Sequence, residues 1–343
     1  MQPIGLDAAF TWQRPGVQIS PGPPLPEYNK FIFLRILYIL MRSLNIGIFH
    51  DESLAKELGK KGSETDILMF NRKKDDLVMT FMYPLKLIPK IQIMSIIDIA
   101  IISLDEITPE FGETVLLIDA LGITKGFLVV SKQIEDAAKS IIKGTAVENF
   151  QMIERDPIKI IQELEKIVVD RDIDSPSSVV IDQSFNVKGI GTVILGFVKM
   201  GTIRKHDALR LLPCGKSVVI RSIQIHDKDY EYADAGTRIG AALKGVDAEE
   251  IRRGFILSSV DVEVSQKFKI RLKKNKFYPE IKKGPCHMVL GMQSAHVEIT
   301  ETDGNDITLK LEKPVAYDNK DKVILIDLNA KKLHFIGVGE IIS

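Results

Sequence analysis

The chain is poor in cysteine and has no excess of charge of either sign. Its two cysteines, Cys214 and Cys286, are far apart and do not show a spacing typical of a metal site. We therefore expect a reduced, cytoplasmic protein, with a single disulfide left open as the alternative. Because 46 basic residues balance 46 acidic ones, the formal net charge is zero. Any RNA-binding surface must then come from a local cluster of charges.

A hydrophobic run long enough to span a membrane is missing as well. The apolar stretch Phe31–Met41 has only 11 residues, whereas a membrane helix needs roughly 20. It begins 30 residues into the chain and lacks a small-residue cleavage site, so we expect no signal peptide. Residues 1–43 are a leader of foreign composition, with five of the 15 prolines between Pro15 and Pro26. A disordered leader, an added amphipathic segment and translated upstream sequence before a true start at Met41 all remain open, and the regular pattern beginning at Leu44 favours the last.

Catalytic and metal-binding patterns are also lacking. The six histidines show no paired spacing for a metal, and neither cysteine lies in a recognisable nucleophile motif. We therefore predict no catalytic residues and no metal site.

Residues 44–170 alternate between strands and helices. Helices are predicted to begin at Asp51, at Thr108–Pro109 and at Asp156–Pro157, each with a residue type that caps or opens a helix. This alternation predicts an α/β domain with a parallel sheet. The predicted strands are Leu44–Phe49, Ile67–Phe70, Leu77–Met82, Ile96–Ser103, Phe127–Val130 and a short one near Phe150–Ile153.

The loop after the first strand of such a sheet is the usual place for a bound phosphate. A phosphate loop needs the pattern G-x-x-x-x-G-K-[ST], whose backbone amides wrap the phosphates. Here the strand containing Gly47 runs directly into His50, Asp51 and Glu52. Two carboxylates at this point oppose phosphate binding, so an ordinary strand–helix turn is the better interpretation.

The rest of the chain favours strands. A polar linker at residues 170–178 is followed by short β-rich segments separated by glycine turns, which predict barrels over residues 179–259 and 260–343. One segment of the second barrel region is strongly basic, and Glu280 is the only acidic residue within it. Its cations are Lys267, Lys269, Arg271, Lys273, Lys274, Lys276, Lys282 and Lys283.

The order of residues in the β-rich part resembles that of translation elongation factors of the Tu type, and most closely their selenocysteine-specific branch. The resemblance rests on IDQSFNVKGIGTV at 181–193, on ADAGTRIGAALKGVD at 233–247 and on the segment leading to Gly254. The helix that ends in Ala-Leu-Gly at Gly122 is similar to a helix of the same family. The resemblance implies a reduced α/β domain like that of P-loop GTPases, followed by two β-barrels.

The resemblance also shows which nucleotide-binding elements are missing. Where the family reads guanine with Asn-Lys-x-Asp, this chain has Ser131-Lys132-Gln133-Ile134, so the guanine-binding carboxylate is absent. Gly47 and Lys132 are the only remnants of the nucleotide site that we single out. We expect no GTP hydrolysis and no GTP or magnesium cofactor, which leaves the chain without an expected enzymatic activity.

In the family, the barrel after the GTPase domain receives the acceptor end of aminoacyl-tRNA. By position, Asp182 and Arg253 match an acid and an arginine of the amino-acid pocket in the selenocysteine branch, and Gln183 stands where that branch has a basic residue. A neutral glutamine does not favour an anionic selenolate, so a neutral amino acid or a bare CCA end is implied. Asp182 as a turn residue and Arg253 in a surface ion pair are equally open.

The basic segment is a candidate for contacts with the RNA backbone, because such contacts need only positive charge. A solvated hairpin is the alternative. The sequence therefore predicts an elongation factor-like protein that binds tRNA or a ribosomal surface without a GTP cycle. A GTP-binding factor with divergent motifs that delivers aminoacyl-tRNA, and a module that binds another translation protein, are the alternatives. We expect neither membrane nor DNA as a partner.

Overall fold

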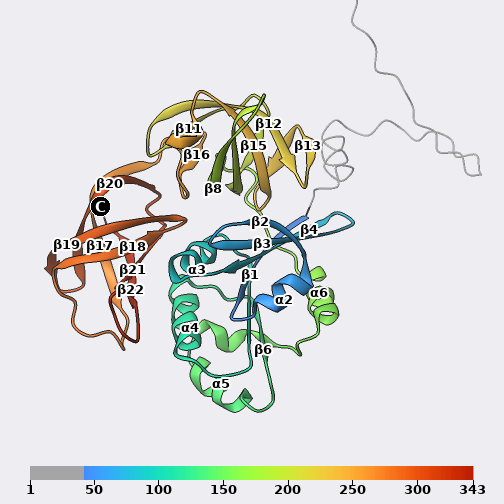
Figure 1. Cartoon of the computed structure of the whole chain (residues 1–343). Coiled ribbons are helices and arrows are strands. Elements are labelled where there is room, and N and C mark those ends of the chain that lie inside the picture. The colour runs from blue at the N-terminus through green and yellow to red at the C-terminus, as the bar shows by residue number, and fades with distance from the viewer. Residues whose placement is uncertain (1–41, 343) are drawn as a thin grey trace, which may run out of the picture. The chain divides into compact units, whose positions relative to one another are not determined.

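The computed structural model describes residues 42–342, which form an α/β domain and two closed six-stranded barrels (Figure 1). The predicted architecture is therefore confirmed. β1 (Arg42–Phe49) begins two residues before the expected Leu44, because Arg42 already pairs with Leu77 in the sheet. The remainder of the leader predicted for residues 1–43 lies outside the described residues.

The sheet of the α/β domain has seven strands in the order β2-β3-β4-β1-β5-β6-β7. β4, β1, β5, β6 and β7 run parallel, as predicted, but β2 and β3 are antiparallel to their neighbours. β2 and β3 are antiparallel because two-residue turns join β2 to β3 and β3 to β4, and a parallel crossover needs a much longer connection. The strands besides β1 are β2 (Lys60–Glu64), β3 (Ile67–Lys74), β4 (Leu77–Pro84), β5 (Ile99–Leu104), β6 (Gly126–Val130) and β7 (Gln151–Met152).

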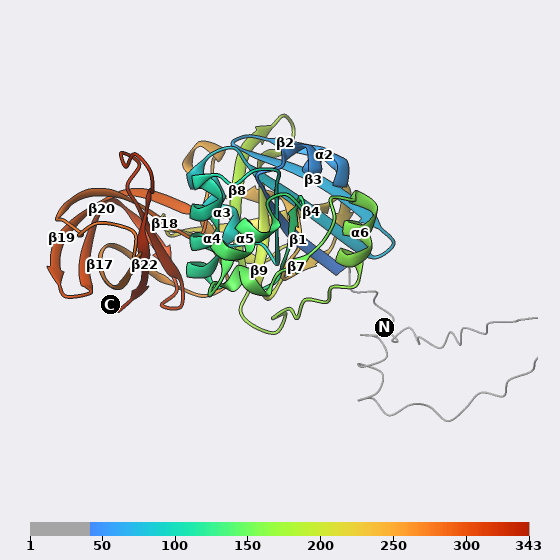
Figure 2. The ribbon, with the colours of Figure 1, turned by 90° about the horizontal axis from the view of Figure 1, so that it is seen from below.

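Helices cover both faces of this sheet (Figures 1 and 2). Leu44, Ile46 and Ile48 alternate along β1 and pack with α2 and α6, while Phe49 belongs to the apolar cluster on the side of α3, α4 and α5. Asp51, Thr108 and Asp156 cap their helices as predicted. The helices are α2 (Glu52–Leu58), α3 (Leu87–Met94), α4 (Pro109–Leu121), α5 (Glu135–Ile142) and α6 (Pro157–Glu165), with a 3₁₀ turn at Ala146–Asn149.

The first barrel closes through the ring β11-β16-β8-β9-β15-β12, in which β12 pairs back to β11. Its inward-facing aliphatic side chains form one separate core. Its strands are β8 (Ser178–Val187), β9 (Gly191–Met200), β10 (Thr202–Arg204), β11 (Ala208–Leu212), β12 (Lys216–Ile225), β13 (Lys228–Tyr230), β14 (Tyr232–Asp234), β15 (Arg238–Lys244) and β16 (Ile256–Ser258), with a 3₁₀ turn at Ala248–Glu250.

The second barrel closes in the order β17-β20-β19-β18-β21-β22. It too has a core of its own inside the ring. Its strands are β17 (Glu263–Lys274), β18 (Gly284–Leu290), β19 (Gln293–Asp303), β20 (Asp306–Tyr317), β21 (Lys322–Ile326) and β22 (Phe335–Ile341).

Candidate functional site in a basic cleft beside the first barrel

At the carboxyl edge of the parallel strands, where nucleotides bind in related sheets, several protein side chains bond to one another. At the start of α2, the Asp51 carboxylate accepts hydrogen bonds from the Leu54 amide (2.8 Å) and from Ser103 Oγ (2.8 Å). Arg155 Nε donates to the same carboxylate at 2.8 Å, and its Nη2 reaches Glu57 at 2.9 Å. Asp51 thus lies in the loop after the first strand, which is the usual place for a phosphate in such sheets.

The protonation of Asp51 agrees with this arrangement. Burial raises the pKa of its carboxyl, but hydrogen bonds from Arg155, Leu54, Ser53 and Ser103 outweigh burial and lower the pKa well below its ordinary value. The carboxylate is therefore charged at neutral pH and already fully engaged.

The two remnants of a nucleotide site lie on separate elements. Gly47 is in the interior of β1, where a Cβ would come within 2.9 Å of the Phe49 ring, so side-chain packing explains the glycine. Lys132 is exposed just after β6. Neither residue belongs to a phosphate-binding loop.

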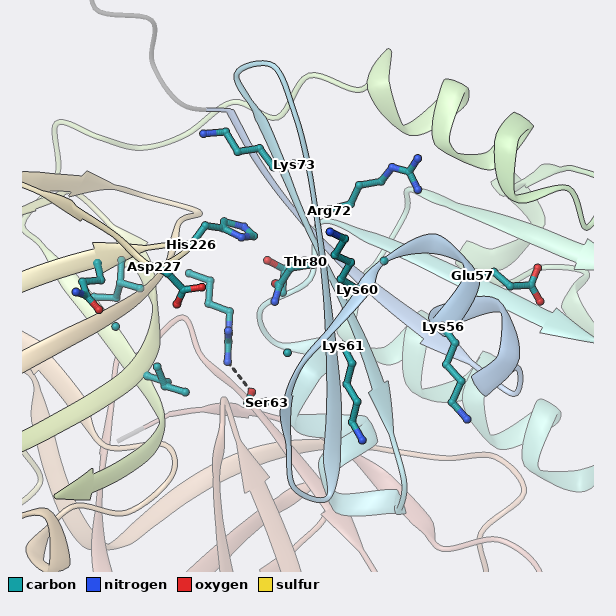
Figure 3. A pocket seen from close by; sticks show the side chains of 18 residues that line it. Lys56, Glu57, Lys60, Lys61, Ser63, Arg72, Lys73, Thr80, His226 and Asp227 are labelled. Atoms are coloured by element: carbon teal, nitrogen blue, oxygen red, sulfur yellow. Dashed lines mark hydrogen bonds between the residues drawn. The ribbon is translucent and has the colours of Figure 1, made fainter. Parts of the chain in front are cut away.

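A basic cleft of about 990 Å³ lies between the α/β domain and the first barrel. Its walls come from the end of α2, the hairpin of β2 and β3, and strands of the barrel (Figure 3). Five cations of the α/β domain line it, together with Arg238 and His226 of the barrel, against only Glu57 and Asp227. The five are Lys56, Lys60, Lys61, Arg72 and Lys73.

The charges along the cleft differ in how far they are neutralised. Lys56 pairs with Glu52 at 2.7 Å, and Lys61 pairs with Glu64. Among the ion pairs of residues 42–342, none involves Lys60 or Lys73. Both are exposed, so their ammonium groups are available to an anionic ligand.

Arg238 brings a buried positive charge to the cleft. Its Nη2 donates to Ser63 Oγ of β2 at 2.8 Å, the bond drawn as a dashed line in Figure 3. Its Nε is buried without a hydrogen-bond partner, and the guanidinium lies over the Phe197 ring, 5.9 Å from its centroid. Burial lowers the pKa of Arg238, and the nearby Asp182 carboxylate opposes that shift. A buried donor without a partner costs free energy, so Arg238 is held in place at a cost to stability.

Asp182 and Arg253, matched by position to the amino-acid pocket, do lie together. Arg253 Nε is 3.2 Å from Asp182 Oδ1, although the angle leaves that oxygen without a hydrogen bond. Gln183 donates to the other carboxylate oxygen at 3.3 Å. Burial raises the pKa of Asp182, while Arg253 and Arg238 oppose the shift. Neither Asp182 nor Arg253 lines the basic cleft, so their role as pocket residues stays a proposal.

Sequence reasoning missed Arg238, although it stands in the family-like stretch ADAGTRIG at 233–240. An arginine within an otherwise apolar strand is the signal that could have revealed it. Gln183 does lack a positive charge, as noted from the sequence. The structure nevertheless places the positive charge of Arg238, 56 positions further along the chain, near Asp182.

The basic segment of the second barrel has more counterions than the sequence indicated. Strand alternation puts Lys267, Lys269, Arg271 and Lys273 on one face of β17, away from the barrel interior. Across the ladder, Asp306 of β20 binds Arg271 at 2.9 Å and lies 3.8 Å from Lys269. The expectation of Glu280 as the only counterion is therefore wrong, because strand pairing brings in an acid from outside the segment.

The following turn uses its cations partly for its own structure. Lys274 donates to the carbonyls of Asn275 and Tyr278, and Lys276 lies over the Phe277 ring at 4.9 Å. Lys267 and Lys273 remain exposed. The segment stays a proposed RNA contact with less free charge than its composition suggests.

Metal and redox sites receive no support from the described part of the chain. Within it, no group of three or more His, Cys, Asp or Glu residues is arranged to hold a metal. Cys214, which is exposed, and Cys286, which is buried, are free thiols in this structure. Burial raises the pKa of Cys286 to about 12. No helix between residues 42 and 342 has both the length and the hydrophobicity to span a membrane.

Comparisons with known proteins agree with this architecture. The family described as elongation factor Tu domain 2 matches residues 191–258. An uncharacterized protein of Methanocaldococcus jannaschii is 40% identical over 309 residues, which are 88% of this chain and 100% of that protein. The selenocysteine-specific elongation factor of the same organism is 32% identical over 209 residues, 52% of this chain and 44% of that factor.

A solved structure extends the likeness over nearly the whole chain. Translation elongation factor SelB of Methanococcus maripaludis, in complex with the GTP analogue GPPNHP, superposes with a TM-score of 0.77 at 25% identity. The match covers 89% of this chain and 80% of SelB. With the α/β domain, the two barrels and these relatives in agreement, this chain is a translation elongation factor-like protein and belongs to the family of elongation factor Tu and SelB.

Proposed function

We propose that this protein binds the acceptor end of a tRNA in the basic cleft and that it does so without a GTP cycle. The observation that supports this most is the cleft itself, in which free ammonium groups of Lys60 and Lys73 lie near the buried guanidinium of Arg238. Translation-machinery partners follow from the family, and a cytoplasmic location goes with them. A ribosomal surface is the alternative RNA partner.

The cleft suits the end of an RNA strand for a chemical reason. Phosphates of the backbone bind to solvent-exposed lysines without regard to sequence, and binding releases counterions. Arg238 lines the cleft, and its positive charge would attract a phosphate near the end of the strand. Gln183 and the Asp182–Arg253 pair lie within the barrel, and we propose that they help to position Arg238 beside the terminal residue.

The absence of a GTP cycle rests on the edge of the sheet beside α2. Asp51, held by Arg155 and Ser103, lies where such sheets usually bind a phosphate, and no glycine-rich loop precedes it. Displacing Asp51 would break its charged hydrogen bonds from Arg155 and leave that guanidinium with Glu57 as its remaining carboxylate partner, which is costly. A GTP-binding elongation factor with divergent motifs is the second candidate, because the SelB structure named above holds a GTP analogue.

Titration of GTP with magnesium into the full chain distinguishes these two candidates. We expect no heat of binding at submillimolar nucleotide. Saturable binding in that range would favour the second candidate and overturn the proposal.

RNA binding is tested by filter retention of tRNA on the full chain at several salt concentrations. The double variant Lys60→Ala/Lys73→Ala should weaken binding about tenfold at low salt and reduce the salt slope by about 2, since each lysine that contacts a phosphate contributes about 1. The matched control is Lys125→Ala/Lys313→Ala, which removes two exposed charges outside the cleft and the basic segment.

A salt slope near zero for the unmodified chain would leave a protein-interaction module as the better function. Equal losses in the cleft variant and in the control would show that RNA does not bind in the cleft. The pair Lys267→Ala/Lys273→Ala then tests the exposed face of β17 in the same assay.

A further inference from the structure

A single buried amide side chain contacts both barrels from the α/β domain. Gln92 lies on α3 and is only 3% exposed. Its Nε2 donates to the Met292 carbonyl of the second barrel at 2.7 Å, a bond buried on both sides. Its Oε1 accepts from Arg253 Nη1 of the first barrel at 3.4 Å. The same side chain therefore links all three domains.

Arg253 extends this link to the hairpin that forms a wall of the cleft. Its Nη1 donates to Asp66 at 2.6 Å, and its Nη2 donates to Thr65 Oγ1 at 3.2 Å. These two residues form the turn between β2 and β3. Its Nε also donates to the Asp182 carbonyl of β8 at 3.3 Å. The guanidinium thus joins the hairpin turn to the first barrel.

The backbone and the apolar side chains near Gln92 are closely packed, so α3 and the two barrels are held against one another. Gly254 has a φ of +86°, and a Cβ at this position would lie 2.4 Å from the amide nitrogen of Gln293. Ile91 and Met94 of α3 share one apolar cluster with Val180 of the first barrel and Met292 of the second. Moving α3 away from either barrel would expose apolar surface and strand buried polar groups.

We propose that Gln92 is a positioning residue that, through Arg253, holds the β2–β3 hairpin and the cleft in one geometry without a nucleotide. A nucleotide-driven switch requires two arrangements that a ligand binds unequally. Here Arg253 gives the hairpin turn two hydrogen bonds from within the protein. The role of Gln92 in holding the hairpin does not depend on RNA binding. Only the expected effect on tRNA binding rests on the proposed function.

The test is amide hydrogen exchange of the full chain, read by mass spectrometry on peptides that span the hairpin. Gln92→Met keeps the length of the side chain and removes both hydrogen bonds. We expect exchange of residues 60–68 to rise about tenfold, while peptides from β20 stay unchanged, because local opening affects only the elements released. If Gln92→Met only destabilised the whole fold, amide exchange would instead rise in all peptides, including those from β20.

Further variants separate the two bonds of Gln92. Gln92→Glu still accepts from Arg253 but cannot donate to the Met292 carbonyl, so the hairpin should stay protected. Lys199→Ala breaks an exposed 2.8 Å ion pair to Asp321 between the barrels and should not affect the hairpin. If Gln92→Met does not fold, Arg253→Lys takes its place in the test. A lysine cannot bond to Asp66, Thr65 and the Asp182 carbonyl at once, so exchange of the hairpin should rise.

Two results would overturn the proposal. One is hairpin exchange that is unaffected by Gln92→Met or Arg253→Lys in folded protein. The other is an unmodified hairpin that gains protection only when GTP and magnesium are added. Weaker tRNA binding by Gln92→Met is expected as well, by about fivefold. If the unmodified chain retains no tRNA, the proposed function fails, while the exchange data still decide the role of Gln92.

Discussion

The surroundings of His50 change the pKa of its side chain. It follows β1 with a positive φ of 72°, and its ring packs edge-on against Phe111. Its Nε2 is 3.0 Å from Thr114 Oγ1. Burial, together with the positive charge of Lys90, lowers the pKa of His50 to about 4. The ring is therefore neutral in the folded protein at neutral pH.

This shift predicts a loss of stability in mild acid. The unfolded chain takes up a proton on His50 near its ordinary pKa of 6.5, whereas the folded chain does so only near 4. Stability should fall as the pH drops from 6.5 towards 4, by about 2 to 3 kcal/mol at pH 4.5 from this residue alone. Urea unfolding at pH 7 and pH 4.5 measures the loss, and His50→Asn should reduce it, since asparagine tolerates the positive φ and does not titrate. An equal loss in both proteins would contradict the assignment.

Glu113 is the second residue with a prediction of its own. It lies on α4 and is 5% exposed, and its Oε1 accepts from the amides of His334 and Phe335 at 2.7 and 2.9 Å. Glu113→Ala would leave both amides without a partner and should lower the free energy of unfolding by about 2 to 4 kcal/mol. Glu113→Gln keeps one acceptor oxygen and should cost clearly less. Similar losses for the two variants in urea unfolding would argue that packing, not hydrogen bonding, dominates.

Among the elements, α4 has the most complete set of terminal signals. Thr108 Oγ1 accepts from the Phe111 amide at 3.2 Å, Pro109 follows in the first turn, and Gly122 closes the helix with a φ of +75°. All three features were predicted and are confirmed. They act within a few residues of one another, which is why local sequence was sufficient.

Gly112 inside α4 and Gly122 at its C-cap should respond with opposite signs to the same substitution. Gly122→Ala forces a side chain into the left-handed region and should destabilise the protein by roughly 1 kcal/mol. Gly112→Ala adds a methyl group with nothing within 4 Å in the helix interior, and should stabilise the protein by about 0.5 to 1 kcal/mol. Thermal unfolding of both variants checks the pair. Changes of the same sign would contradict it.

At the scale of the whole molecule, one apolar cluster crosses all three domains. It joins Phe111 of α4 to Phe197 of the first barrel and Phe335 of the second. The Glu113 and Gln92 hydrogen bonds described above add polar links at the same junctions. The domains therefore share part of their buried surface.

This shared core predicts that the described part of the chain unfolds in one transition. Differential scanning calorimetry of the full chain should give a single peak whose calorimetric and van't Hoff enthalpies agree. Gly254→Ala, whose Cβ would clash with Gln293, should separate the second barrel and divide the peak. Two peaks in the unmodified chain would show that the domains unfold independently.

Sequence reasoning failed for elements that lack local signals. α3, with the sequence LIPKIQIM, has no capping side chain at Lys86 and was not predicted. The polar strand β2, KKGSE, was missed too, because only its pairing with β3 defines it. The strand predicted at Ile96–Ser103 begins at Ile99, since Ile96 and Ile97 belong to the turn that closes α3.

The sequence by itself determined the architecture, the family resemblance and the loss of the phosphate loop, because each depends on residues that are close together in the chain. Only the tertiary structure decided which charges are free and which are paired. It joined Arg253 to Asp66, turned Arg238 towards Ser63 and supplied Asp306 to Arg271. The partners in these pairs are 187, 175 and 35 positions apart. Their meeting follows from strand pairing and domain packing, which no local pattern encodes.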